Sequence, residues 1–69
     1  MVNKFAERLN ELLQEREISQ RCLAKAINVT SATVSVWSRG IKQPTADNII
    51  AVAKYFDVSS DYLLGLSDI

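Results

Sequence analysis

The sequence contains no histidine and only one cysteine, Cys22, among its 69 residues. A single cysteine excludes an internal disulfide, and the lack of histidine leaves no plausible zinc site. The same shortage removes the commonest general base and every cysteine–histidine pair for nucleophilic catalysis. We therefore expect a protein that is not an enzyme and that uses no metal, cofactor or small-molecule substrate. Cys22 is interpreted as an inert boundary thiol, with redox sensing as the alternative.

Long apolar runs are also missing. No stretch approaches the roughly 20 residues of a membrane-spanning helix, and the N-terminal sequence MVNKFAERLN has no apolar signal-peptide core. We therefore expect a cytoplasmic protein without a membrane partner. A chain of 69 residues without a linker or an internal repeat is expected to form one domain, residues 1–69.

The net charge is zero, but the charged residues are not spread evenly along the chain. Residues 1–18 sum to −1 and residues 45–69 to −3, whereas residues 19–44 sum to +4 and contain no acid. The four cations of this acid-free segment are Arg21, Lys25, Arg39 and Lys42. One interpretation is chance clustering on a small surface. The other is a face that binds phosphates, with the acids kept on the far side.

The charge excess coincides with two short helical patterns within residues 19–40. Ser19 and Thr30 are residue types that cap helix N-termini, and each is followed by apolar residues at helical spacing. Asn28 and Val29 stand between the two patterns, and asparagine tolerates the left-handed backbone of a sharp turn. Helix, tight turn and helix make up a DNA-reading helix-turn-helix. A structural helical hairpin in a small bundle has the same layout and stays open as the alternative.

The rest of the chain predicts three further helices. Residues 3 to about 16 carry an apolar stripe at helical spacing, formed by Phe5, Leu9, Leu12 and Leu13. Thr45 is the expected cap of a helix that ends near Asp57, and Ser59 is the expected cap of a short last helix closed by Gly65. The predicted fold is a compact all-α domain of five helices, with residues 19–40 supplying the second and third.

The outward face of the third helix is unusual for a surface. Val34 and Trp37 are expected to point inward, which leaves Ser31, Ala32, Ser35 and Val36 outside. Small residues are compatible with a bland soluble surface, yet long charged side chains usually fill such a face. Serine can bond to any base edge, and the methyl groups of alanine, valine and threonine can contact thymine methyl groups. We favour contact with a major groove.

The ordered set of residues resembles the lambda-repressor-like, Cro-and-repressor-type helix-turn-helix family. The residues that carry the resemblance include Ser19-Gln20, Leu23-Ala24, Val29-Thr30, Val34, Trp37, Arg39-Gly40, Pro44 and the ending VSSDYLLG of residues 58–65. The resemblance implies a lambda-repressor-like domain from a phage or bacterial transcription regulator, such as a repressor, that binds double-stranded operator DNA as a homodimer. The residues that it implies for base contacts are Ser31, Ala32, Thr33, Ser35 and Val36. Those that it implies for phosphate contacts are Gln20, Arg21, Thr30, Arg39, Lys42 and Gln43.

Three departures from the family pattern carry expectations of their own. Glu17 stands where the family often has glycine and adopts left-handed backbone less readily, so the first helix is expected to end differently. Leu13 and Ser38 replace a frequent ion pair between the first and third helices, and packing is expected to take its place. The base-facing positions hold no residue capable of bidentate base recognition. This predicts either low affinity or specificity through thymine methyl groups and DNA shape.

Two further hypotheses remain open from the sequence. The donor-poor face and the zero net charge are compatible with a protein-interaction module of the same fold, antitoxin-like or regulator-binding, that binds DNA weakly or not at all. For dimerisation, the last apolar residues are expected to lie too near the end to be fully covered; they are Leu63, Leu64, Leu66 and Ile69. The alternative is that these residues cap the core of a monomer.

Overall fold

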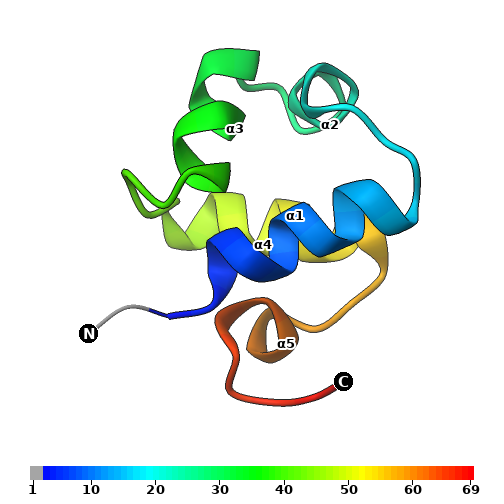
Figure 1. The fold of residues 1–69 in the computed structure, drawn as a ribbon, viewed down its shortest axis with the longest axis vertical. Coiled ribbons are helices and arrows are strands. Elements are labelled where there is room, and N and C mark those ends of the chain that lie inside the picture. Colours follow the sequence, from blue (N-terminus) through cyan, green and yellow to red (C-terminus); the bar gives the residue numbers. More distant parts are fainter. Residues whose placement is uncertain (1–2) are drawn as a thin grey trace.

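Five α-helices follow one another along residues 3–69, the part of the chain that this computed structural model describes (Figure 1). They are α1 (Phe5–Glu15), α2 (Gln20–Ala26), α3 (Ser31–Ser38), α4 (Ala46–Phe56) and α5 (Ser60–Leu64). This part contains no strand, and the predicted all-α fold of five helices is confirmed. The first helix begins at Phe5 rather than at residue 3, with Lys4 as its N-cap residue. Asn3, before this residue, accepts a hydrogen bond at its Oδ1 from the Phe5 N–H at 2.9 Å.

Each of the other four helices has a serine or a threonine at its N-cap position. In each case the side-chain oxygen accepts a hydrogen bond from the backbone N–H three residues further on; the residues are Ser19, Thr30, Thr45 and Ser59. Such a bond satisfies one of the N–H groups that a helix start leaves free, and it is typically worth about 1 kcal/mol. The predicted caps are therefore confirmed, including the two that fix the starts of α2 and α3.

All five helices of residues 3–69 end with the same backbone motif. A residue with left-handed backbone is followed by an apolar residue whose N–H donates to the carbonyl five positions earlier. The donor–acceptor pairs are Ile18–Leu13 at 2.9 Å, Val29–Ala24 at 2.9 Å, Ile41–Val36 at 3.0 Å, Val58–Ala53 at 3.0 Å and Leu66–Asp61 at 2.8 Å. Glu17 has φ +54° and adopts the same conformation as Asn28 and Asp57. The expectation that α1 ends differently is wrong, because this local bonding pattern holds the glutamate in place.

The core is apolar throughout the described residues, and α1 contributes four of its members, Phe5, Leu9, Leu12 and Leu13. Trp37 is buried and its ring meets the Phe5 ring edge-on, with centroids 6.0 Å apart. The prediction that Trp37 belongs to the core is confirmed. This contact attaches α3 to α1 and so fixes how α3 sits on the rest of the domain.

The last helix corrects one expectation about the C-terminal residues. Leu63 is 0% exposed, because α5 packs on α1 and α4 and turns this side chain into the core. Leu64 is half-buried. Leu66 is 72% exposed and Ile69 is 89% exposed, as expected for residues beyond the last helix.

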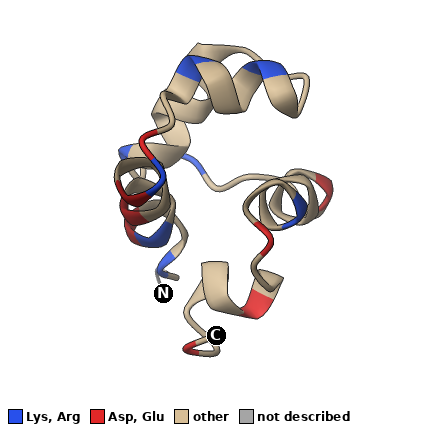
Figure 2. Ribbon diagram, turned by 90° about the vertical axis from the view of Figure 1, so that its right-hand side faces the viewer, with Lys and Arg blue, Asp and Glu red and all other residues tan. Residues whose placement is uncertain are grey.

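The helices are arranged so that the helix-turn-helix lies at one end of the molecule. In Figure 1, α1 and α4 cross the middle, α2 and α3 lie on one side, and α5 and the C-terminus lie on the other. Figure 2 shows the same separation after a quarter turn. None of the helices in residues 3–69 has both the length and the apolar character needed to span a bilayer.

Candidate nucleic-acid interface

The turn between α2 and α3 is built from a few residues. Asn28 has φ +63°, and the Val29 N–H donates to the Ala24 carbonyl at 2.9 Å. Ala24 is buried and Val29 is half-buried against the core. A small side chain at Ala24 allows the two helices to pack closely. The turn therefore sets α3 rigidly against α2 with its outer face free.

The residues on the outer face of α3 differ in their exposure to solvent. Ser31 and Ala32 are exposed, and Thr33, Ser35 and Val36 are half-buried. Val36 packs partly against the core, so it is less exposed than the sequence suggested. The structure brings these five predicted base-facing residues onto one short helix. Ser31 and Ala32, at its N-terminal end, are the most accessible.

Two hydroxyl groups of this helix are already engaged. Thr30 Oγ1 accepts the Thr33 N–H at 3.1 Å, and the two threonine hydroxyls lie 2.8 Å apart in a second hydrogen bond. Thr30 thus serves mainly as the cap of α3. The Ser31 hydroxyl has no hydrogen-bond partner within residues 3–69 and remains available at the surface.

A hydrogen-bonded network centred on Ser38 ties the end of α3 to two other helices. Gln20 Nε2 donates to Ser38 Oγ at 3.0 Å, and Ser38 Oγ donates to the Ser35 carbonyl at 2.9 Å. Asn10 Nδ2 donates to the Ser38 carbonyl at 2.8 Å. The missing family ion pair is therefore replaced by hydrogen bonds at Ser38, together with the expected packing of buried Leu13. The sequence predicted the packing but not these hydrogen bonds.

The predicted phosphate-contacting residues lie on α2 and around the end of α3. Arg21, Arg39, Lys42 and Gln43 are exposed, and Gln20 is half-buried. Arg39 Nε donates to the Ser35 carbonyl at 3.4 Å, which holds the guanidinium beside α3. Gln43 Oε1 accepts a hydrogen bond from Asn3 Nδ2 at 3.0 Å, which ties the loop after α3 to the start of the chain.

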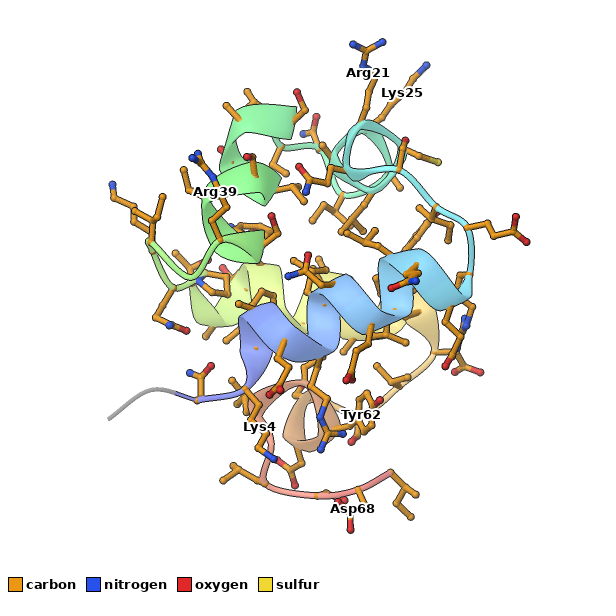
Figure 3. The ribbon with its side chains drawn as sticks, viewed as in Figure 1. Lys4, Arg21, Lys25, Arg39, Tyr62 and Asp68 are labelled. Carbon is orange, nitrogen blue, oxygen red and sulfur yellow. The ribbon has the colours of Figure 1, made fainter. Side chains whose placement is uncertain are left out.

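The cations of residues 19–44 have no carboxylate partner within the described chain. Both ion pairs found in residues 3–69 lie elsewhere: Arg8 with Asp68 at 3.9 Å, and Arg16 with Glu15 at 3.9 Å. Figure 2 shows only basic colouring on the end formed by α2 and α3. In Figure 3, Arg21 and Lys25 project from α2 away from the body, Arg39 lies beside α3, and Asp68 lies at the opposite end.

A groove of about 380 Å³ runs between α3 and the loop that follows it. The residues that line it are Ala32, Thr33, Val36, Trp37, Ile41, Lys42 and Gln43. Five of these are predicted contact residues, so the groove belongs to the same face. A larger hollow of about 660 Å³ is lined by residues of α1 and α5, including Glu11 and Glu15. Its carboxylates disfavour phosphate binding.

Two residues of this region were not singled out from the sequence. Asn10 pairs with Ser38 across 28 positions of sequence, and no local pattern indicates such a pair. Ile41 follows Gly40, at the position where Ile18, Val29 and Val58 follow the left-handed residues of other helices. That regularity was available in the sequence and would have drawn attention to Ile41.

The single cysteine lies on α2, away from the outer face of α3. Cys22 is exposed, as its interpretation as a boundary thiol requires, and its Sγ lies 3.8 Å from the Tyr55 hydroxyl. This hydrogen bond is the main cause that raises the pKa of Tyr55, followed by desolvation and the charge of the thiolate. The Tyr55 hydroxyl therefore stays neutral at neutral pH. No metal-binding cluster occurs among the described residues.

Comparison with known sequences gives a consistent result. The sequence model of the helix-turn-helix family matches residues 9–63. The chain is 34% identical over 60 residues to the HTH-type transcriptional regulator DicA of Escherichia coli, covering 87% of this chain and 44% of DicA. It is 33% identical over 60 residues to repressor protein C2 of Salmonella phage P22, covering 87% of this chain and 28% of C2. The chain therefore spans less than half the length of these two relatives.

Solved structures agree with the sequence comparison. A transcriptional regulator from Listeria innocua superimposes with a TM-score of 0.87 at 32% identity, covering 94% of this chain and 61% of that chain. The P22 c2 repressor, solved in complex with a synthetic operator, superimposes with a TM-score of 0.85 at 30% identity. That match covers 91% of this chain and 96% of the repressor chain.

Proposed function

The chain belongs to the helix-turn-helix family, and from this premise we propose that residues 1–69 form the DNA-binding domain of a transcriptional regulator. In this proposal α3 lies in the major groove of operator DNA in the cytoplasm, and the bound domain represses transcription. One observation carries the proposal: the four cations of residues 19–44 have no carboxylate partners in the described chain and flank an uncharged, outward-facing α3.

The base contacts come from the outer face of α3. Ser31 and Ala32 approach the base edges most closely because they are the most exposed residues of this face. Thr33, Ser35 and Val36 lie beside them. None of the five side chains can make a bidentate bond to a base, so the face relies on hydroxyl groups, on methyl contacts and on the shape of the DNA.

The phosphate contacts come from both sides of α3. Arg39 and Lys42 bind the sugar–phosphate backbone at the end of α3, with Gln43 next to them. Arg21 binds from α2. The Gln20 amide carries two N–H groups, of which one donates to Ser38 and the other is free for a phosphate oxygen. Such contacts position a protein on a duplex without reading its sequence.

We further propose that the regulator binds as a homodimer. One α3 reads a single stretch of groove, and a symmetric pair spans two half-sites about one helical turn apart. Leu66 and Ile69 follow α5 in the chain, have exposed side chains and are the proposed contact residues. Sedimentation with and without residues 65–69 tests this interface, and an unchanged mass removes the tail from it.

Selection from random duplexes tests the DNA-binding function directly, since it reports both the half-site sequence and the spacing. Replacing Arg39 and Lys42 together with glutamate is expected to abolish binding to the selected duplex. The matched control replaces Arg16 and Lys54 with glutamate, which changes the net charge equally but lies outside residues 19–44. Equal loss in both variants contradicts a specific phosphate face.

The same variants separate this function from a protein-interaction module. Such a module enriches no duplex and keeps its partner when Arg39 and Lys42 are reversed in charge. A regulator loses DNA binding under that change. Failure to enrich any duplex therefore favours the interaction module over the proposed function.

A further inference from the structure

The five residues that close the helices of residues 3–69 differ in exposure: Ile41 and Leu66 have exposed side chains, whereas the other three pack on the core. Ile18, Val29 and Val58 each follow a left-handed residue, close a helix with a backbone hydrogen bond and pack on the core. Ile41 makes the equivalent bond, from its N–H to the Val36 carbonyl at 3.0 Å, after Gly40 with φ +72°. Its side chain is nevertheless 61% exposed. The fold therefore uses the backbone of Ile41 and leaves its side chain free.

The free side chain borders the groove beside α3. Ile41 lines this groove of about 380 Å³ together with Val36 and the edge of Trp37, which supply apolar walls. Thr33 also lines it, but its hydroxyl is held by Thr30 at 2.8 Å. Lys42 and Gln43 stand at the same groove and supply its polar end. The groove thus joins an apolar surface to a cation.

DNA offers a matching pair of groups. Among the base edges in a major groove, the C5 methyl group of thymine is the apolar one, and each base lies next to a phosphate. Lys42 complements the phosphate, and the Val36–Ile41 surface complements the methyl group.

From this arrangement we propose that the groove between α3 and Ile41 is a receptor for the C5 methyl group of a thymine in each half-site. The inference rests on the proposed function and adds to it a chemical basis for specificity. Thymine is distinguished from uracil, and 5-methylcytosine from cytosine, by contact with Val36 and Ile41. Lys42 holds the adjoining phosphate and places the methyl group in the groove.

The test uses the duplex obtained by selection, with each thymine replaced in turn by uracil, which removes one methyl group and nothing else. We expect one thymine per half-site whose replacement weakens binding about fourfold, the effect of losing one buried methyl-sized group. Cytosine at that position is expected to bind more tightly once it is methylated at C5. The Ile41→Ala variant is expected to bind thymine and uracil duplexes equally.

Controls keep the outcome interpretable. Ile50 is an exposed apolar residue of α4 outside the interface, and Ile50→Ala is expected to retain the thymine preference. Because Ile41 is exposed, Ile41→Ala is expected to fold normally, and circular dichroism checks this.

Tight binding without any thymine-to-uracil effect overturns the inference and leaves the proposed function intact. A preference that survives both Ile41→Ala and Val36→Ala also overturns it. Absence of binding to every duplex refutes the proposed function itself.

Discussion

Replacing Lys42 with glutamine should reduce the salt dependence of DNA binding by a definite amount. Each phosphate that a cation neutralises adds about −0.9 to the slope of log K against log salt. Three of the proposed phosphate contacts are cations, namely Arg21, Arg39 and Lys42, and they predict a slope of about −2.7 for each bound chain. Affinity per chain is expected to fall roughly 40-fold between about 50 and 200 mM salt. Lys42→Gln should bring the slope to about −1.8.

The assay is fluorescence anisotropy with a labelled duplex at several salt concentrations. Lys54→Gln is the matched control, because Lys54 is also an exposed lysine but lies on α4, outside residues 19–44. Its slope is expected to equal that of the unmodified protein. The reasoning is refuted if Lys42→Gln leaves the slope unchanged, or if both glutamine variants reduce it equally.

Three other substitutions test the fold by urea unfolding. Asn10→Ala removes the bond between α1 and the end of α3 and is expected to cost about 1 kcal/mol; no loss means that the bond is not formed in solution. Thr30→Ala removes the α3 cap and is expected to cost about 1 kcal/mol, with Thr30→Ser close to neutral; equal losses contradict the cap. Gly65→Ala should destabilise more than Gly40→Ala, because a new Cβ at Gly65 lies 2.8 Å from Lys4 Cγ. The reverse order contradicts this packing.

Much of the fold was predictable because its determinants are local. Ser19 caps α2 through a bond to Cys22 only three positions away, and Thr30 caps α3 through Thr33 in the same manner. Sequence spacing alone reveals such bonds. The apolar stripe of α1 is equally local, and all its predicted members are buried. The number and order of the helices follow from these features.

The remaining features depend on contacts between distant residues. The burial of Leu63 follows from how α5 packs on α1 and α4, which its nearness to the chain end did not indicate. The network at Ser38 joins this residue to Asn10 and Gln20, which lie 28 and 18 positions away in the sequence. Reasoning from single helices cannot find such partners.

The candidate site was predictable in composition but not in shape. The acid-free segment and the small residues of α3 were evident from the sequence, and the structure places them on one end of the molecule. The sequence did not reveal that Val36 is half-buried or that Ile41 borders a groove beside it. Those details depend on how the loop after Gly40 folds back on α3.

The claim that α3 reads base edges is tested most directly by changing one residue of its outer face and repeating the selection from random duplexes. Ala32→Gln places a side chain capable of bidentate bonding to adenine at an exposed position of α3. We predict that the selected sequence changes at one or two positions in each half-site and keeps its spacing. An unchanged selected sequence, with affinity retained, contradicts the claim.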